Sequence, residues 1–575
     1  MSRFSDRLKL SVSAAALMGG SLIAASSARA VTITGTQTSA SVTNVVDDVT
    51  IAGTGVISPN GLFVNSLIGD LVNNGLIEGE VTTAAALTSG SADFLIRTTA
   101  FDLNSGMTGD ITNNGTIAAS ATGSASYTDA GAANPTHDSD ALAHAIDING
   151  GLVGDFTNNN DILSDASNSL TVTRGTEATP AGAPVNINDD VYANAQGVEI
   201  DSMTGTFTNT SPLTIASTAD SSSSHSVVAQ GGPADVDIID LDVQATSTSV
   251  YIRGGTYAFD NEGTISAQAS GDVGVDILAV ATAGVADVDA DVSRVYPQAY
   301  PVYLRGTVTG FTNSGTISGD LSSTADVNIV ATGAAAADVD ITNAVWGYLT
   351  TVHVRDLDGN FENSGTISAT TDSSLQATVS ASSANGAATI GVDDFASVGV
   401  YGGQYAVYIG SLDGTFTNSS ALTIEGTSSG SADYDLSAQG ASAVIDIEDV
   451  YVYQSMRAVE IDGGTYAVNN SGTISSTADS SATVNAAATG TDGLALIYVS
   501  QSNFASASGF HAGGTSVTDF SNSGTISSTA ATDLAVVAAA SGETQAYVTV
   551  DTTTMRIRAV SISVRWTEVF PIHRR

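Results

Sequence analysis

The sequence predicts an all-β protein, an elongated right-handed parallel β-solenoid made of about ten repeats. A phrase of the form apolar-x-Asn-x-Gly-x-Ile returns at nearly even intervals between Leu71 and Ile526, and its cleanest copies read FTNSGTI at 311–317 and FENSGTI at 361–367. Within the phrase, apolar and polar residues alternate, as in extended chain with one buried face. A fixed period in the range of about 20–50 residues is typical of proteins whose units bury apolar faces against their neighbours.

The central Asn-x-Gly of the phrase predicts a tight corner between two strands, because both residues tolerate a positive φ. One asparagine of this kind occurs in each repeat. They are Asn73, Asn113, Asn158, Asn209, Asn261, Asn313, Asn363, Asn418, Asn470 and Asn522. We interpret them as the structural marker of the repeat.

A second strand is expected before each corner. A pair of β-branched or aliphatic residues, such as Val250 and Ile252, begins nine residues before the apolar residue of the phrase. The residue between the two members of each pair is expected to face solvent. In six successive repeats these residues are Glu199, Tyr251, Tyr303, His353, Tyr408 and Glu460.

The number of coils in each repeat stays open at this point. Coils of roughly 20–25 residues are common in solenoids, which favours two coils in each repeat, about twenty coils in all and a rod on the order of 100 Å long. If each repeat were one wide coil instead, the ten asparagines would lie above one another and form a hydrogen-bonded ladder. A β-propeller is the rival architecture, but ten copies exceed the usual 4–8 blades.

The two ends of the chain differ from the repeats. Residues 1–30 predict a signal peptide: Arg3, Arg7 and Lys9 precede an apolar stretch, and Ala28-Arg29-Ala30 fits a cleavage site. No later stretch predicts a transmembrane helix. Residues 31–550 form the repetitive region, and residues 551–575 are a basic, non-repetitive tail, interpreted either as a cap or as a truncated or frameshifted end.

Composition limits the possible partners. The chain has no cysteine, so an exported form must depend on packing and hydrogen bonds for its stability. Residues 31–550 contain seven basic and 56 acidic residues. A surface with this charge repels nucleic acid and anionic lipid and attracts divalent cations.

An acidic row is the candidate metal site. Asp237, Asp289, Asp340, Asp394 and Asp446 recur once in each repeat at nearly even intervals, so they are expected to line one face of the stack. Calcium takes six to eight oxygen ligands, often from several carboxylates, and this row is the candidate Ca²⁺ site. The alternative is that the aspartates only keep a sheet-rich protein soluble. No other cofactor is expected.

No arrangement of residues predicts catalysis. His137 and His144, with Asp138 and Asp140, are interpreted as a solvated loop rather than a metal site. Four arginines also recur along the chain. We interpret them as isolated ion-pair partners in an acidic coat, and the alternative is that they form a spaced row on the outer surface. These residues are Arg253, Arg305, Arg355 and Arg457. The motifs of serine hydrolases, zinc proteases and phosphate loops are absent. We therefore expect no catalytic residues and no enzyme activity.

The export signal, the acidic Ser/Thr/Ala/Gly-rich body without cysteine and the repeated N-S-G-T-I phrases together resemble the passenger region of bacterial autotransporters and related surface β-helix proteins. The resemblance covers about residues 31–550. It implies export to the outer surface of a Gram-negative bacterium, often for adhesion or aggregation. It departs from the family pattern in lacking the C-terminal outer-membrane barrel, so we expect that the sequence is incomplete, or that the protein is released or held by a partner such as a separate barrel.

We therefore expect an exported, non-catalytic, adhesin-like structural protein at the cell surface or outer membrane, or outside the cell. Its expected partners are a host or neighbouring cell, the extracellular matrix, or other copies of itself, and not nucleic acid. One alternative is an acidic surface-layer protein with Ca²⁺-dependent assembly. Another is a secreted β-helix polysaccharide lyase or hydrolase, since fold alone does not determine function.

Overall fold

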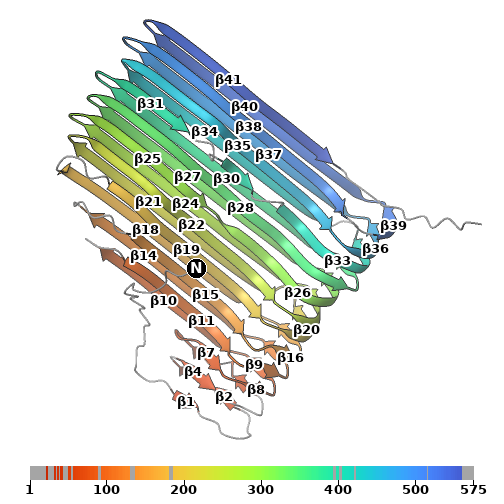
Figure 1. Ribbon diagram of the computed structural model, residues 1–575. Helices are drawn as coiled ribbons and strands as arrows, with labels where there is room; N and C mark the ends of the chain where they lie inside the picture. Colours follow the sequence, from red (N-terminus) through yellow and green to blue (C-terminus); the bar gives the residue numbers. More distant parts are fainter. Residues whose placement is uncertain are drawn as a thin grey trace, which may run out of the picture.

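The structure is a computed structural model of the chain. It describes residues 21–23, 31–33, 35–37, 39–42, 49–53, 56–87, 92–129, 136–179, 185–392, 397–400, 404–419, 423–513 and 516–559. Every regular element in these ranges is a β-strand, and the strands form two sheets of 12 and 29 strands (Figure 1). All pairs between named strands are parallel, as a solenoid requires. The predicted all-β parallel β-solenoid is confirmed.

One repeat forms one coil. The strand β21 (Thr214–Gly231) crosses the molecule, β22 (Ala234–Ile252) returns, and β23 (Gly255–Asn261) leads into β24 (Thr264–Ala281), which lies beside β21. The favoured arrangement of two short coils in each repeat was therefore wrong. The single wide coil, left open as the alternative, is the observed arrangement.

The 12-stranded sheet receives one strand from each coil (Figure 1). Its other strands are β3 (Thr36–Gln37), β6 (Val56–Ile57), β10 (Leu76–Leu87), β14 (Thr116–Asp129), β18 (Ile162–Thr179), β27 (Thr316–Gly333), β30 (Thr366–Ser383), β34 (Thr423–Gly440), β37 (Thr473–Gly490) and β40 (Thr525–Gly542). From β18 onward each of these strands has 18 residues.

The 29-stranded sheet receives the return strands and the shorter strands near the corner. The return strands besides β22 are β11 (Ala92–Leu103), β15 (Thr136–Ile148), β19 (Val185–Ile200), β25 (Val285–Val295), β26 (Gln298–Asn313), β28 (Ala336–Asp358), β31 (Ala387–Val392), β32 (Ser397–Val400), β33 (Gln404–Asn418), β35 (Ser442–Ile461), β38 (Leu494–Ala512) and β41 (Gln545–Ala559).

The corner strands besides β23 are β8 (Leu67–Ile68), β9 (Leu71–Asn73), β12 (Met107–Thr108), β13 (Ile111–Asn113), β16 (Leu152–Val153), β17 (Phe156–Asn158), β20 (Met203–Asn209), β29 (Phe361–Asn363), β36 (Gly464–Asn470) and β39 (Ser516–Asn522). The first coils add β1 (Ser21–Ile23), β2 (Val31–Ile33), β4 (Ala40–Val42), β5 (Val49–Ile51) and β7 (Leu62–Val64).

The wide coils make the stack about as broad as it is tall (Figure 1). An 18-residue strand is about 60 Å long at ~3.3 Å per residue. Twelve strands at a spacing of ~4.8 Å give a stack about 53 Å tall. The stack therefore has twelve coils where about twenty were favoured from the sequence, and its height is about half of the ~100 Å expected.

The ten asparagines of the phrase form one continuous ladder at the corner. Each of the nine steps is a hydrogen bond from Nδ2 of one asparagine to Oδ1 of the next, 2.7 to 2.9 Å long. The side chains from Asn73 to Asn418 are completely buried, and Asn470 is 2% exposed. In a low-dielectric interior such amides need partners, and each coil supplies the partner of the next.

A phenylalanine column lies two residues before the ladder. The rings of Phe156, Phe207, Phe259, Phe311, Phe361 and Phe416 are stacked nearly parallel, with centroids 4.7 to 5.1 Å apart. All six side chains are buried. The alternation predicted from the phrase is confirmed here, because Phe, Asn and Ile point inward together.

The glycine of the phrase is required by the distance between coils. A Cβ on Gly315 would lie 1.9 Å from the carbonyl oxygen of Gly263 in the preceding coil, and a Cβ on Gly365 would lie 2.0 Å from that of Gly315. None of these three glycines has a positive φ. The tight corner predicted at Asn-x-Gly is present, but the reason given for the glycine, a positive φ, was wrong.

The structure describes only parts of the two terminal segments that were predicted from the sequence. Of the predicted signal peptide, residues 1–30, only 21–23 are described, so the signal lies outside the description almost entirely. The boundary predicted at residue 550 falls inside β41, which pairs with β38 as far as Ala559. Residues 560–575 of the predicted tail lie outside the described residues.

Candidate functional site

The predicted acidic row is in register over three coils of the 29-stranded sheet. Asp237 pairs with Asp289, and Asp289 pairs with Asp340. In the next coil Gly391 occupies this position, and Gly391 pairs with Asp446. Asp394 lies outside the described residues. The row therefore consists of three consecutive aspartates, a glycine and a fourth aspartate.

The carboxylates converge elsewhere, between β19 and β22. Oxygen atoms of Asp190, Asp240 and Asp242 all lie within 4.8 Å of one another, the only such group of three or more potential metal ligands among the described residues. The sequence did not predict this group. A shift of register after Ile187 and Ile238 brings it together, because Ile239 is an extra residue in β22 and Asn188 then pairs with Asp240. Only the pairing of the strands reveals this shift.

Mutual repulsion and partial burial perturb this acidic group. Burial, followed by the negative charges of Asp138, Asp242 and Asp240, raises the pKa of Asp190 to about 6. Burial, followed by the charge of Asp240, raises the pKa of Asp242 to about 6 as well. A divalent cation would relieve this repulsion, and Ca²⁺ takes its ligands from such carboxylates. These three residues could hold a metal ion in part, with water as the remaining ligands.

The region around His137 and His144 is a buried strand. Both residues belong to β15, and their exposed fractions are 1% and 8%. The interpretation of this region as a solvated loop was wrong, because it is a strand whose alternation puts His137 on the inner face, while His144 is buried with its Nδ1 3.9 Å from Asp147 Oδ2. His137 Nδ1 lies 2.8 Å from Asp189 Oδ1, and the imidazole ring lies 4.4 Å from the ring of Tyr127.

Asp189 also lies close to a second buried histidine. His225 Nδ1 is 3.7 Å from Asp189 Oδ2, and His225 Nε2 is 2.7 Å from Ser223 Oγ. This sequence of serine, histidine and aspartate has the order of a nucleophilic relay. However, the three side chains are at most 2% exposed, so no substrate can reach the serine in this conformation. Burial lowers the pKa of His225 to about 4, so the ring is neutral at pH 7.

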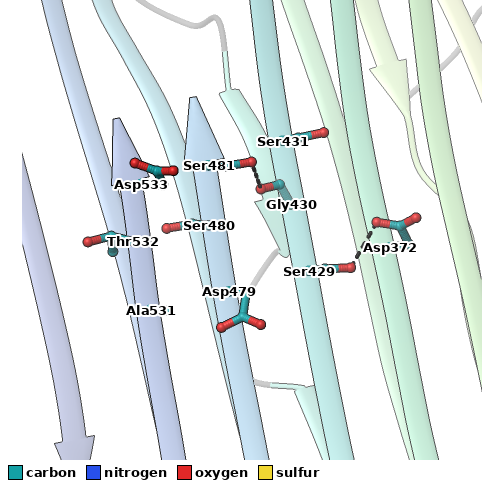
Figure 2. Close-up of a pocket in the computed structure, with 10 residues that line it drawn as sticks. All are labelled: Asp372, Ser429, Gly430, Ser431, Asp479, Ser480, Ser481, Ala531, Thr532 and Asp533. Atoms are coloured by element: carbon teal, nitrogen blue, oxygen red, sulfur yellow. Dashed lines mark hydrogen bonds between the residues drawn. The ribbon is translucent and has the colours of Figure 1, made fainter. Parts of the chain in front are cut away.

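A shallow pocket lies on the 12-stranded sheet, across β30, β34, β37 and β40 (Figure 2). Its volume is about 250 Å³, enough for a small molecule. Its lining residues are Asp372, Ser429, Gly430, Ser431, Asp479, Ser480, Ser481, Ala531, Thr532 and Asp533. Ser429 donates a hydrogen bond of 2.8 Å from Oγ to Asp372 Oδ1. The lining thus offers carboxylates and hydroxyls and no basic group.

Six residues between the paired apolar residues were predicted to face solvent. The prediction was wrong for Glu199 and Glu460, which are only 5% exposed and contact Arg253 and Arg457, and an aromatic row occupies the other four positions. Tyr251, Tyr303, His353 and Tyr408 are paired in register across four coils. Their ring centroids are 5.1, 4.4 and 4.9 Å apart in turn, and the rings are tilted against one another. All four side chains of the row are half-buried, so each is partly accessible to solvent.

More tyrosines and three arginines adjoin this row. Tyr300 contacts Tyr303 and Tyr348, and Tyr405 contacts Tyr408. Arg305 donates a hydrogen bond of 2.7 Å to Tyr303 Oη and lies over the rings of Tyr251 and Tyr303. We call this set the aromatic–arginine strip: Tyr251, Tyr300, Tyr303, Tyr348, His353, Tyr405 and Tyr408 with Arg253, Arg305 and Arg457.

The arginines at the two ends of the strip form ion pairs with acidic residues. Arg253 contacts Glu199 and lies 3.1 Å from Asp201, while Arg457 contacts Glu460. Arg355 is more exposed and lies 3.8 Å from Asp356. Of the four recurrent arginines, three thus have acidic partners, as expected of ion pairs in an acidic coat. The exception is Arg305, for which the described residues provide tyrosine partners.

Comparison of the chain with protein-family models, with curated proteins and with solved structures finds no match. Within the described ranges, no helix is long and apolar enough to cross a membrane.

Proposed function

We propose that this chain is an exported, non-catalytic structural protein of the bacterial cell surface that acts in adhesion or self-association. The single observation that supports this most strongly is the uninterrupted ladder from Asn73 to Asn522, which makes ten coils into one stack. The stack presents broad sheet faces with polar residues outward. Together with the predicted signal and the likeness to autotransporter passengers, it favours a scaffold that displays a surface.

The strongly acidic coat supports the same proposal. A net charge of −43 opposes lateral aggregation of long sheets in solution. Stability without cysteine also suits an exported protein, since the ladders between coils do not depend on the redox state outside the cell.

Surface display can be tested on intact cells. The full chain is expressed in a Gram-negative host with an epitope in the exposed turn at residues 384–386, and accessibility to an external protease and antibody is measured. We expect labelling of intact cells, and loss of labelling when residues 1–30 are deleted. Labelling only after the cells are lysed would contradict the proposal. A second measurement compares adhesion and aggregation of cells with and without the protein.

A second candidate is an acidic surface-layer protein that assembles with Ca²⁺, and the Asp190–Asp240–Asp242 group favours it. In such proteins the cation would offset the repulsion between acidic subunits. Micrographs of cells that display the protein should then show a regular lattice that dissolves in a chelator. Protein at the surface without any lattice would leave the adhesin proposal in place and contradict this candidate.

A further inference from the structure

Basic residues are scarce in this protein, and their distribution is uneven. The repetitive region, residues 31–550, has seven. Three of them, Arg253, Arg305 and Arg457, contact tyrosine rings of the aromatic–arginine strip, and Arg355 follows the strip residue His353 by two positions. The strip therefore contains three of the seven basic residues of the repetitive region. It also brings seven aromatic rings together on the 29-stranded sheet.

The direction of the strip follows the axis of the stack. Tyr251, Tyr303, His353 and Tyr408 lie on successive coils, and Arg457, which pairs with Tyr405, lies on the fifth. Neighbouring coils are about 4.8 Å apart. This spacing is close to the length that one pyranose unit adds to a linear polysaccharide. A chain of sugars laid along the strip would meet a new ring or guanidinium group with each unit.

The chemistry of the strip suits sugars. Aromatic rings take up the apolar C–H faces of pyranoses, while hydroxyl, guanidinium and carboxylate groups exchange hydrogen bonds with sugar hydroxyls. The strip has both kinds of group side by side. Tyr303 Oη accepts from Arg305, and Tyr408 Oη donates to Asp462 Oδ2 at 2.8 Å. Planar side chains held by ring contacts lose little entropy when a ligand binds.

Charge selects the class of polysaccharide. The protein carries a net charge of −43, and Arg253 and Arg457 at the ends of the strip are already paired with Glu199 and Glu460. A polymer of uronic acids would be repelled by this field. A neutral polysaccharide would not be.

We propose that the aromatic–arginine strip binds a neutral linear polysaccharide along the axis of the stack, with one sugar unit to each coil. This inference rests on the proposed role in adhesion and names the chemical class of the partner. Binding by this strip needs no catalytic step.

The test measures binding of the purified full chain to neutral linear oligosaccharides of increasing length by calorimetry, with β-glucan, xylan and mannan series as probes. We expect affinity to rise with length up to about five units, because the strip spans five coils from Tyr251 to Arg457. Oligouronates are the negatively charged comparison, and we expect that they do not bind to the protein. No binding of any neutral series at millimolar concentration, or salt-sensitive binding of uronates alone, would overturn the inference.

Two variants locate the site. Tyr303→Ala and Arg305→Gln are each expected to weaken binding at least about tenfold. Tyr451→Ala is the matched control, because Tyr451 is an exposed tyrosine of β35 outside the strip, 43% accessible. Tyr303→Phe keeps the ring and loses the hydroxyl, so its melting temperature should stay near that of the wild type. It therefore tests position 303 in a folded protein even if Tyr303→Ala misfolds. Equal binding by Tyr303→Ala and the wild type would overturn the assignment.

The two proposals fail in different experiments. Protein that is displayed on intact cells and promotes adhesion without binding neutral polysaccharide would refute this inference and leave the proposed function standing. Protein that binds neutral polysaccharide in solution but never reaches the cell surface would refute the proposed function and leave the binding site standing.

Discussion

Asn313 donates a hydrogen bond from Nδ2 to Oδ1 of Asn363, which is 2.8 Å away in the next coil. Neither side chain is accessible to water. The bond joins two successive coils at the corner and is one step of a ladder in which each asparagine has an identical neighbour above and below. Removing one step leaves a donor in one coil and an acceptor in another without their partners.

Asn313→Ala is therefore expected to lower the free energy of unfolding by about 1–3 kcal/mol, the usual cost of leaving buried polar groups unpaired. Chemical denaturation followed by circular dichroism measures the change. Ser314→Ala, at the exposed adjacent position, is the control and should stay within about 0.5 kcal/mol of wild type. Equal midpoints for Asn313→Ala and the control would show that the ladder contributes no stability.

The phenylalanine column should be the most sensitive part of the core. Phe311 is stacked against Phe259 and Phe361, and none of its surface is exposed. Phe311→Ala is expected to cost about 3–5 kcal/mol, because it leaves a cavity between two coils. Phe63→Ala removes a ring that is 38% exposed, and its expected effect is much smaller. A cost below about 1 kcal/mol at position 311 would mean that the neighbouring coils close the gap.

The corner glycines should not tolerate even one methyl group. In Gly315→Ala the new Cβ would lie 1.9 Å from the carbonyl oxygen of Gly263, so the two coils must separate locally. We expect a loss of at least about 2 kcal/mol. Gly310→Ala is a close control, since a Cβ at Gly310 meets no atom within 4 Å. Similar melting temperatures for the two variants would contradict the steric explanation.

The acidic group between β19 and β22 predicts a dependence on pH. The pKa of Asp242 is raised to about 6 in the folded protein, above its ordinary value, so folding favours the protonated carboxyl. This contribution to stability is fully present below the ordinary pKa and is lost as the pH rises through about 6. Asp242→Asn should therefore be more stable than wild type at pH 8, and the difference should shrink by pH 4.

Thermal unfolding of both proteins across this pH range measures the difference. Asp433→Asn, an exposed aspartate of β34, controls for the loss of one negative charge from a protein of net charge −43. If Asp242→Asn and Asp433→Asn differ from wild type equally at every pH, the local repulsion proposed for the group is absent.

Calcium should act on the same group. At pH 7.5, millimolar Ca²⁺ is expected to raise the melting temperature of the wild type, because binding to the folded state alone stabilises it by mass action. Asp190→Asn should reduce the increase, since Asp190 supplies one of the three converging carboxylates. Asp289→Asn, in the row predicted from sequence, should not. An unchanged melting temperature of the wild type would exclude a calcium role here, and a loss confined to Asp289→Asn would favour the predicted row.

Features that the alternation along one strand sets could be predicted from the sequence more readily than features that depend on pairing between repeats. The inward direction of Phe311, Asn313 and Ile317 followed from alternation alone, because side chains on a strand point to opposite faces in turn. The burial of His137 did not follow, since local composition suggested a loop. The convergence of Asp190 with Asp240 and Asp242 could not follow either, because it needs the extra residue Ile239 in one strand and not in its neighbour.

By itself, the sequence determined that extended segments of fixed period stack in parallel, which residues of the phrase are buried and that the surface is acidic. These properties are set by side-chain periodicity and composition, and both are local. Only the tertiary structure decided that one repeat makes one coil, and hence that Asn313 meets Asn363, that Tyr303 meets His353 and that Gly391 interrupts the aspartate row. Such contacts depend on the register between strands that lie a full repeat apart in the chain, which packing of the whole coil sets.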